Sequence, residues 1–174
     1  PDGACNNRFN HKFPLLPDNY DHKYVYSNIG YNLKPLDLQC AVGLEQLKKL
    51  PEFSRKRKEN FKRLYEVFLQ YQDKIILPVW SEKADVSWFA FPITIKENAG
   101  FKREDIVKFL ENKNIETRML FGGNILRQPG FSNIQKRIVG GLTNTDIVLN
   151  NTFFLGVFPG ITEKKMQYMV ESIN

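Results

Sequence analysis

Cysteine and histidine are scarce in this sequence, which limits the sites that it can build from its own residues. Two cysteines, Cys5 and Cys40, among 174 residues are too few for the disulfide framework of a small secreted domain. The only histidines, His11 and His22, stand at no metal-binding spacing, and we interpret them as surface or loop residues. The sequence contains neither a GxGxxG motif nor a Walker phosphate loop. A disulfide-bonded secreted domain is therefore excluded, and no self-contained zinc or nucleotide motif is present.

Long apolar runs are missing as well. The longest, Ile75–Val79 and Phe153–Phe158, have the length of strands and are interrupted by Pro78 and Gly156, whereas a membrane-spanning helix needs about 20 apolar residues. The first residues are polar and include no Met, so they resemble neither a signal peptide nor a translation start. We therefore expect a cytoplasmic chain that begins inside a longer protein and has no membrane partner.

The sequence does contain enough apolar material for a core, together with an excess of positive charge. Apolar residues make up 42% of the chain and include 14 phenylalanines, which excludes a disordered tail. The 25 lysines and arginines exceed the 19 acidic residues by 6, and much of this excess lies within Ser54–Arg63. Glutamates are interspersed along the same predicted helix. We therefore interpret this basic run as a solvated face and expect no nucleic-acid partner.

The spacing of apolar residues predicts helices interleaved with a few strands. Helices are predicted over residues 35–50, 52–71, 102–112, 143–151 and 163–172, and strands over residues 75–77, 88–95, 115–120 and 152–157. Residues 1–31 are predicted to be loop with at most one strand. Such an order favours an α/β (α+β) fold, in which helices cover one face of a small mixed or antiparallel sheet.

Five residues carry more specific structural expectations. Cys40 stands on the apolar side of the first helix and is predicted to be a core residue. Pro92 cannot donate to a ladder, so its strand is expected at a sheet edge or with a bulge. Thr143 or Asn144 is expected to cap the fourth helix. Thr162 is expected to cap the last one.

Four segments resemble, in the same order, the DegT/DnrJ/EryC1/StrS family of sugar aminotransferases. They are Asn28–Leu50 (NIGYNLKPLDLQCAVGLEQLKKL), Ser87–Lys96 (SWFAFPITIK), Ile115–Phe131 (IETRMLFGGNILRQPGF) and Leu142–Thr162. The resemblance implies a fold-type I, pyridoxal phosphate (PLP)-dependent transferase that works as a homodimer. In that case, residues 35–174 are its small C-terminal domain and residues 1–34 are the last loop and strand of the large cofactor domain.

Within the family, one branch matches best. The segments CNNRFN at Cys5, YDHKY at Tyr20 and RMLFGGNILRQP at Arg118 resemble enzymes that remove the 3-hydroxyl of CDP-4-keto-6-deoxyglucose in 3,6-dideoxysugar and lipopolysaccharide synthesis. This implies pyridoxamine phosphate (PMP) and a 2Fe-2S cluster as cofactors, and an iron–sulfur flavin reductase as partner. Cys5 matches the last of four cluster ligands. The other three, and the histidine that acts as catalytic base, would precede Pro1, so this chain alone is expected to be inactive.

The resemblance also assigns site residues within the chain. Phe89 occupies a position where many relatives carry histidine, and it is expected to stack on the cofactor–sugar intermediate; a core phenylalanine is the alternative. Asn32 is expected to reach the cofactor phosphate of the partner subunit. Arg118, Asn124 and Gln128 are expected to bind the nucleotide sugar, where the guanidinium of Arg118 would suit the diphosphate. A structural salt bridge is the alternative for Arg118.

Two other functions remain open at this stage. The chain could belong to an ordinary PLP-dependent sugar aminotransferase, which a lysine at the upstream cofactor position would indicate. It could also be a separate basic binding module that uses the Ser54–Arg63 face, which salt-sensitive binding of RNA or DNA would indicate.

Overall fold

The computed structural model describes residues 10, 12–18, 21, 24–26, 28–31 and 33–174. It divides into two units, Pro1–Gly43 and Leu44–Asn174. In the first unit, the described residues before helix α1 (Asp37–Phe68) form turns and irregular backbone but no strand. Cys5, His11, His22 and Asn32 lie outside the described residues. The assignment of residues 1–34 to a large cofactor domain therefore stays a prediction.

Helix α1 is one continuous helix, whereas the sequence pattern predicted two. Pro51 lies inside it, at a cost of one backbone hydrogen bond. The second half of the helix is nevertheless anchored, because Phe61, Leu64 and Phe68 are buried in the core. The proline therefore interrupts the backbone hydrogen bonding without ending the helix.

The prediction that Cys40 is a core residue is wrong. Its thiol is free and exposed, and Leu44 and Leu47, which share its side of the helix, are also more than half exposed. The apolar spacing that predicted a buried face is real. Burial, however, also needs a packing partner, and the described part of the chain supplies none for these side chains.

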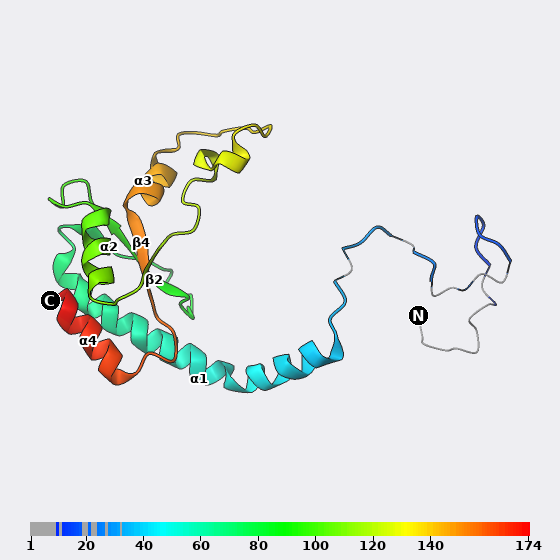
Figure 1. Ribbon diagram of the computed structural model, residues 1–174, viewed down its shortest axis with the longest axis horizontal. Helices are drawn as coiled ribbons and strands as arrows, with labels where there is room; N and C mark the ends of the chain where they lie inside the picture. The colour runs from blue at the N-terminus through cyan, green and yellow to red at the C-terminus, as the bar shows by residue number, and fades with distance from the viewer. Residues whose placement is uncertain (1–9, 11, 19–20, 22–23, 27, 32) are drawn as a thin grey trace. The chain divides into compact units, whose positions relative to one another are not determined.

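The second unit is built on a four-stranded antiparallel sheet with the order β1-β2-β4-β3 (Figure 1). Its strands are β1 (Ile75–Ile76), β2 (Ala90–Ile95), β3 (Thr117–Met119) and β4 (Thr152–Gly156). The two central strands pair from Ala90 opposite Gly156 to Thr94 opposite Thr152. All four predicted strands are present, each shorter than predicted.

Pro92 lies in the interior strand β2, so the predicted edge position is wrong. The register between β2 and β4 runs without interruption through Pro92 and Phe154, so there is no bulge either. The pairing of β2 with β1 covers only Thr94 and Ile95. Pro92 lies beyond the short pairing of β2 with β1, so its missing N–H removes no hydrogen bond between these two strands. An interior strand therefore tolerates the proline.

One face of the sheet forms the core together with helices, as predicted. These helices are α1, α2 (Arg103–Asn112) and α4 (Glu163–Ile173); helix α3 (Thr143–Asn151) precedes β4. Phe91, Leu155 and their neighbours on alternate strand positions are buried, together with Leu110 and Met166 from the helices. Because side chains alternate along a strand, Phe154 and its register partner Arg118 point to the opposite face. That face carries the candidate site.

The two predicted helix caps differ in outcome. Thr162 caps α4 as predicted, since its hydroxyl accepts a hydrogen bond from the Lys165 backbone N–H at 3.3 Å. For α3 the N-cap residue is Leu142, which provides no side-chain cap. Thr143 is already the first helical residue, so neither it nor Asn144 can serve as the cap.

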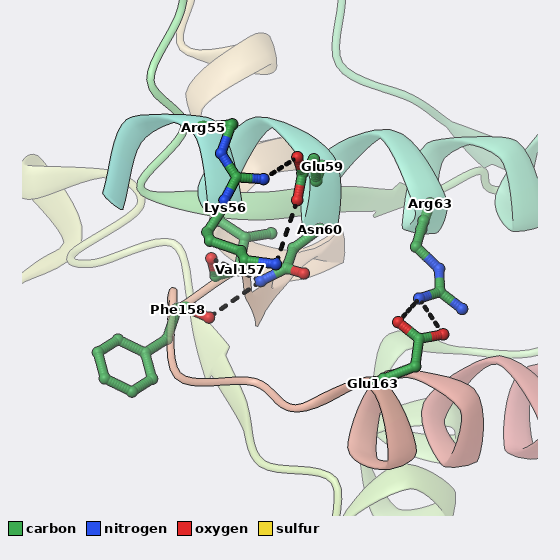
Figure 2. A network of polar contacts seen from close by, with 8 residues as sticks. All are labelled: Arg55, Lys56, Glu59, Asn60, Arg63, Val157, Phe158 and Glu163. Carbon is green, nitrogen blue, oxygen red and sulfur yellow. Dashed lines mark hydrogen bonds and ion pairs between the residues drawn. The ribbon is translucent and has the colours of Figure 1, made fainter. Parts of the chain in front are cut away.

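The loop between β4 and α4 is attached to α1 by polar contacts (Figure 2). The buried Asn60 amide donates to the carbonyl oxygen of Phe158 at 3.0 Å and lies 3.4 Å from that of Val157. Arg63 donates to both carboxylate oxygens of Glu163 at 2.6 Å. These contacts fix the backbone after β4 and thereby the position of Phe158.

The basic run on α1 is largely neutralised within the chain. Ion pairs join Arg55 and Lys56 to Glu59, Lys58 to Asp85, Lys62 to Glu66, and Arg63 to Glu163. This pattern agrees with the interpretation of the run as a solvated face, because each of these positive charges already has an acidic neighbour.

Candidate functional site

A cavity of about 610 Å³ lies on the sheet face opposite the core. Three phenylalanine rings meet there: Phe89 from the segment before β2, Phe121 from the loop after β3, and Phe154 from β4. The cavity is lined by Arg57, Phe89, Arg118, Met119, Phe121, Phe154, Gly156, Val157 and Phe158. Among the described residues, its wall is therefore mostly apolar, and its charged groups are those of two arginines.

Phe89 is exposed and contributes to this cavity. Its side chain is 67% exposed, and its ring centroid lies 6.2 Å from that of Phe121 and 6.0 Å from that of Phe154. The alternative of a core phenylalanine is therefore wrong. The predicted stacking role is compatible with this position and stays a prediction.

Trp88, rather than Phe89, packs against the core, where it is partly buried. Its ring stacks on Phe61 with centroids 3.9 Å apart. Strict alternation along residues 88–95 would have put Phe89 on the same side as Phe91, but β2 begins only at Ala90. The backbone before the strand is not pleated with it, so the period of two does not apply there.

Arg57 holds the Phe89 segment in place, and the sequence analysis did not assign it this role. One guanidinium nitrogen donates to the carbonyl oxygens of Trp88 at 3.3 Å and Phe89 at 3.2 Å. The sequence pattern does place Arg57 on the same helix face as Phe61. A charged group on such an apolar face needs a polar partner. An arginine at a core-facing position indicates a polar contact with a neighbouring segment.

Arg118 lines the same cavity from β3, where it stands opposite Phe154. Its Nε and Nη2 atoms donate to one carboxylate oxygen of Glu116 at 3.1 and 2.6 Å. The salt bridge considered for Arg118 is thus present. Both partners are about 70% exposed, and exposed pairs of this kind contribute little stability. The Arg118–Glu116 pair therefore costs little to break.

Asn124 and Gln128 are engaged in holding the loop that follows β3. The buried Asn124 donates to Asp146 Oδ1 at 2.8 Å and accepts from the Leu126 backbone N–H at 3.1 Å. Gln128 donates to the Gly122 carbonyl oxygen at 3.1 Å. Their expected contacts with a nucleotide sugar stay predictions, while their contacts in the structure stabilise the loop itself.

Asp146 links this loop to α3 as an ionised carboxylate. Hydrogen bonds from Arg127, at 3.1 and 2.9 Å, and from Asn124 hold the pKa of Asp146 below its usual range. A carboxyl group whose pKa is lower in the folded state stabilises the fold above its unfolded pKa. That contribution is lost as the pH falls through the folded value.

We therefore expect a pH-dependent difference in stability between the wild type and Asp146→Asn. The wild-type chain should melt at the higher temperature above about pH 5, and the difference should shrink as the pH falls below about 4. Thermal unfolding followed by circular dichroism between these conditions checks this. Glu82→Gln, at an exposed position, is the control and should keep the wild-type profile. A difference that stays constant with pH would contradict the role of the Asp146 charge.

A second cavity, of about 730 Å³, adjoins the first. The two share Arg118, Phe154, Gly156 and Phe158. It is bordered by the residues before β3 and by the first turns of α4, including Lys164, Lys165 and Tyr168. We take the aromatic cavity as the candidate site, because the predicted site residue Phe89 lines it and does not line the second cavity.

The residues present suit the expected cofactor better than the expected cluster. A 2Fe-2S cluster takes four ligands, and the sequence holds two cysteines. Among the described residues, His, Cys, Asp and Glu form no group of three or more suited to a metal ion. A cluster held by four cysteines, with Cys5 as one of them, would thus need cysteines beyond the two of this sequence. The aromatic walls of the cavity, by contrast, suit a planar conjugated ring.

No described helix combines the length and the apolar character needed to cross a membrane.

Two curated relatives match nearly the whole chain. The chain is 48% identical over 169 residues to the lipopolysaccharide biosynthesis protein RfbH of Salmonella typhimurium strain LT2. This match covers 97% of the chain and 39% of the relative. The chain is 49% identical over 172 residues to the dTDP-4-dehydro-2,6-dideoxy-D-glucose 3-dehydratase of Saccharopolyspora spinosa, and this match covers 99% of the chain and 37% of the relative. The chain thus spans about two fifths of the length of these relatives.

Solved structures show the same fold. The chain superimposes on Escherichia coli GDP-4-keto-6-deoxy-D-mannose-3-dehydratase with bound hydrated PLP at a TM-score of 0.76, with 27% identity. The match covers 87% of this chain and 39% of that one. The predicted fold class, part of a PLP-dependent transferase with a small antiparallel sheet, is therefore confirmed. The profile of the DegT/DnrJ/EryC1/StrS aminotransferase family matches residues 12–174, and this chain belongs to that family.

Proposed function

We propose that this chain is the C-terminal part of a PMP- and 2Fe-2S-dependent nucleotide-sugar 3-dehydrase of the cytoplasm. Its substrate would be CDP-4-keto-6-deoxyglucose, on the route to 3,6-dideoxysugars of lipopolysaccharide. The observation that carries the proposal is the identity of nearly one half, over almost the whole chain, to RfbH and to a 3-dehydratase. The catalytic base, most of the cofactor site and three cluster ligands would lie in the part that relatives have in addition to this chain.

The described residues would supply one wall of the substrate site. Phe89, held by Arg57, presents its ring to the cavity and would stack on a planar group. PMP, when bound, would supply an amine and a conjugated ring that can delocalise charge from a sugar carbon. Arg118 would exchange Glu116 for the substrate diphosphate, to which its planar fork of donors is suited.

Other assignments concern residues that lie outside the described part of the chain. Asn32 would reach the cofactor phosphate of the partner subunit in a homodimer. Cys5 would be the fourth ligand of the cluster, through which an iron–sulfur flavin reductase would deliver electrons. Replacing the 3-hydroxyl by hydrogen consumes two electrons and two protons and releases water, so an external reductant is required.

Product analysis with the complete protein tests the proposal. The protein is purified without oxygen, loaded with PMP, iron and sulfide, and supplied with reductase. CDP-4-keto-6-deoxyglucose is compared with its dTDP and GDP counterparts, and mass spectrometry identifies the products. We expect a 3-deoxy sugar that has lost one oxygen atom. Formation of a 4-amino sugar with glutamate and PLP, without deoxygenation, would instead identify a sugar aminotransferase.

A further inference from the structure

Phe121 has a conformation that works against the stability of the fold. Its φ angle is 47°, in the left-handed region, which is unfavourable for a bulky residue that has a Cβ atom. Its ring is also 76% exposed, so little apolar surface is buried in return. Strained backbone of this kind persists where the surroundings impose it, and it is concentrated at ligand-binding sites.

Several contacts impose this conformation on the loop that carries Phe121. Gly123 has a φ angle of 60°, and a Cβ atom there would lie only 2.7 Å from Leu149 Cα, so this close approach to α3 needs glycine. Asn124 is buried and bonded to Asp146. Gln128 donates to the Gly122 carbonyl oxygen. The loop is thus anchored directly after Phe121, and the exposed ring is held at one place.

That place is the wall of the aromatic cavity. The Phe121 ring lies 6.2 Å from Phe89 with an interplanar angle of 30°, and 6.0 Å from Phe154. Arg118 lines the same cavity from the preceding strand. A ligand that fits this wall needs an apolar portion to lie against the rings and an anionic portion within reach of the arginine.

We infer that Phe121 contacts the ligand and selects the apolar C5–C6 side of a 6-deoxyhexose whose diphosphate binds Arg118. Gly123 and Asn124 are positioning residues that act through Phe121. This inference rests on the proposed function and adds to it the group that the ring recognises. A methyl group can lie against aromatic rings without loss, whereas a 6-hydroxyl there gives up hydrogen bonds to water. Discrimination of this kind in an apolar site amounts to about 10- to 100-fold.

The test measures binding and stability in the complete protein. The probes are a nucleoside diphosphate-6-deoxyhexose and the matched hexose with a 6-hydroxyl, neither of which carries a keto group, and their dissociation constants are measured by calorimetry. We expect the wild type to favour the 6-deoxy probe by about tenfold or more. Phe121→Gly should lose this preference, while its melting temperature stays the same or rises because glycine relieves the strained backbone.

Three further variants separate the ring from the backbone. Phe121→Tyr keeps the ring and should keep the preference. Gly123→Ala, which disturbs the docking of the loop on α3, should lose it. Asn114→Gly changes another residue with positive φ, 57°, outside this cavity, and should raise the melting temperature with the preference unchanged.

The outcomes distinguish this inference from the proposed function. A Phe121→Gly protein that keeps the tenfold preference, or that only loses thermal stability, overturns the inference while wild-type turnover still supports the function. A wild type that binds neither probe and turns over no keto sugar overturns the proposed function, and the inference with it.

Discussion

Replacing Cys5 by serine in the complete protein is expected to remove the iron–sulfur chromophore and abolish deoxygenation. The wild-type protein, purified without oxygen, should be brown and show the charge-transfer absorption between sulfide and iron. A hydroxyl is a poor ligand for iron in such clusters compared with a thiolate, so the Cys5→Ser protein should be largely colourless. Absorption spectra, iron and sulfide content, and formation of the 3-deoxy sugar measure the effect.

Cys40 offers a matched control within the same chain. Its thiol is free and exposed on α1, and the resemblance gives it no ligand role. Cys40→Ser should keep both colour and activity. A Cys5→Ser protein that remained brown and active, or a colourless wild type with full activity, would refute the assignment of Cys5 to the cluster.

Phe61→Ala is expected to cause the largest loss of stability that we predict for this chain. The Phe61 ring is 3% exposed, stacks on Trp88 at 3.9 Å and packs edge-on against Phe91 at 5.0 Å. Truncation of a buried phenylalanine costs about 3–5 kcal/mol, a large part of the typical net stability of about 5–15 kcal/mol. Urea unfolding of the variant and the wild type, followed by fluorescence of the tryptophans, measures this difference.

The control for Phe61→Ala is Phe109→Ala. Phe109 is 43% exposed on α2, so its removal should cost clearly less than that of Phe61 because it creates no closed cavity. Equal losses for the two variants would show that the stack of Phe61 and Trp88 does not organise the core. Since Trp88 precedes Phe89, a displaced Trp88 should also weaken ligand binding in the complete protein.

Much of the fold could be predicted from the spacing of apolar residues. The strand at 152–157 and the helix that begins after Thr162 are found close to their predicted ranges, because their patterns are regular and their ends carry caps or turn residues. The errors concern features that depend on neighbours. Pro51 did not end α1, and Pro92 did not place β2 at an edge, because in each case other contacts decide what a missing N–H costs.

The candidate site could be predicted only in part. Phe89 and Arg118 were assigned through their positions in segments that resemble the family, and the structure places both at one cavity. Arg57 and Phe121 were not assigned. The side chain of Arg57 bonds to backbone carbonyls 31 and 32 residues away in sequence, and the strain at Phe121 is a property of the folded loop.

The order of residues alone thus determined the family, the alternation of helices and strands, and which residue types are available for chemistry, since these depend on local pattern and composition. Tertiary structure decided which aromatic rings remain exposed, which arginine holds which segment, and which polar side chains are already engaged. Those properties arise from contacts between distant parts of the chain, where burial and pairing compete for the same side chain. Asn124 is an example, because its side-chain amide bonds to Asp146 and to the Leu126 N–H and so stabilises the loop that carries Phe121.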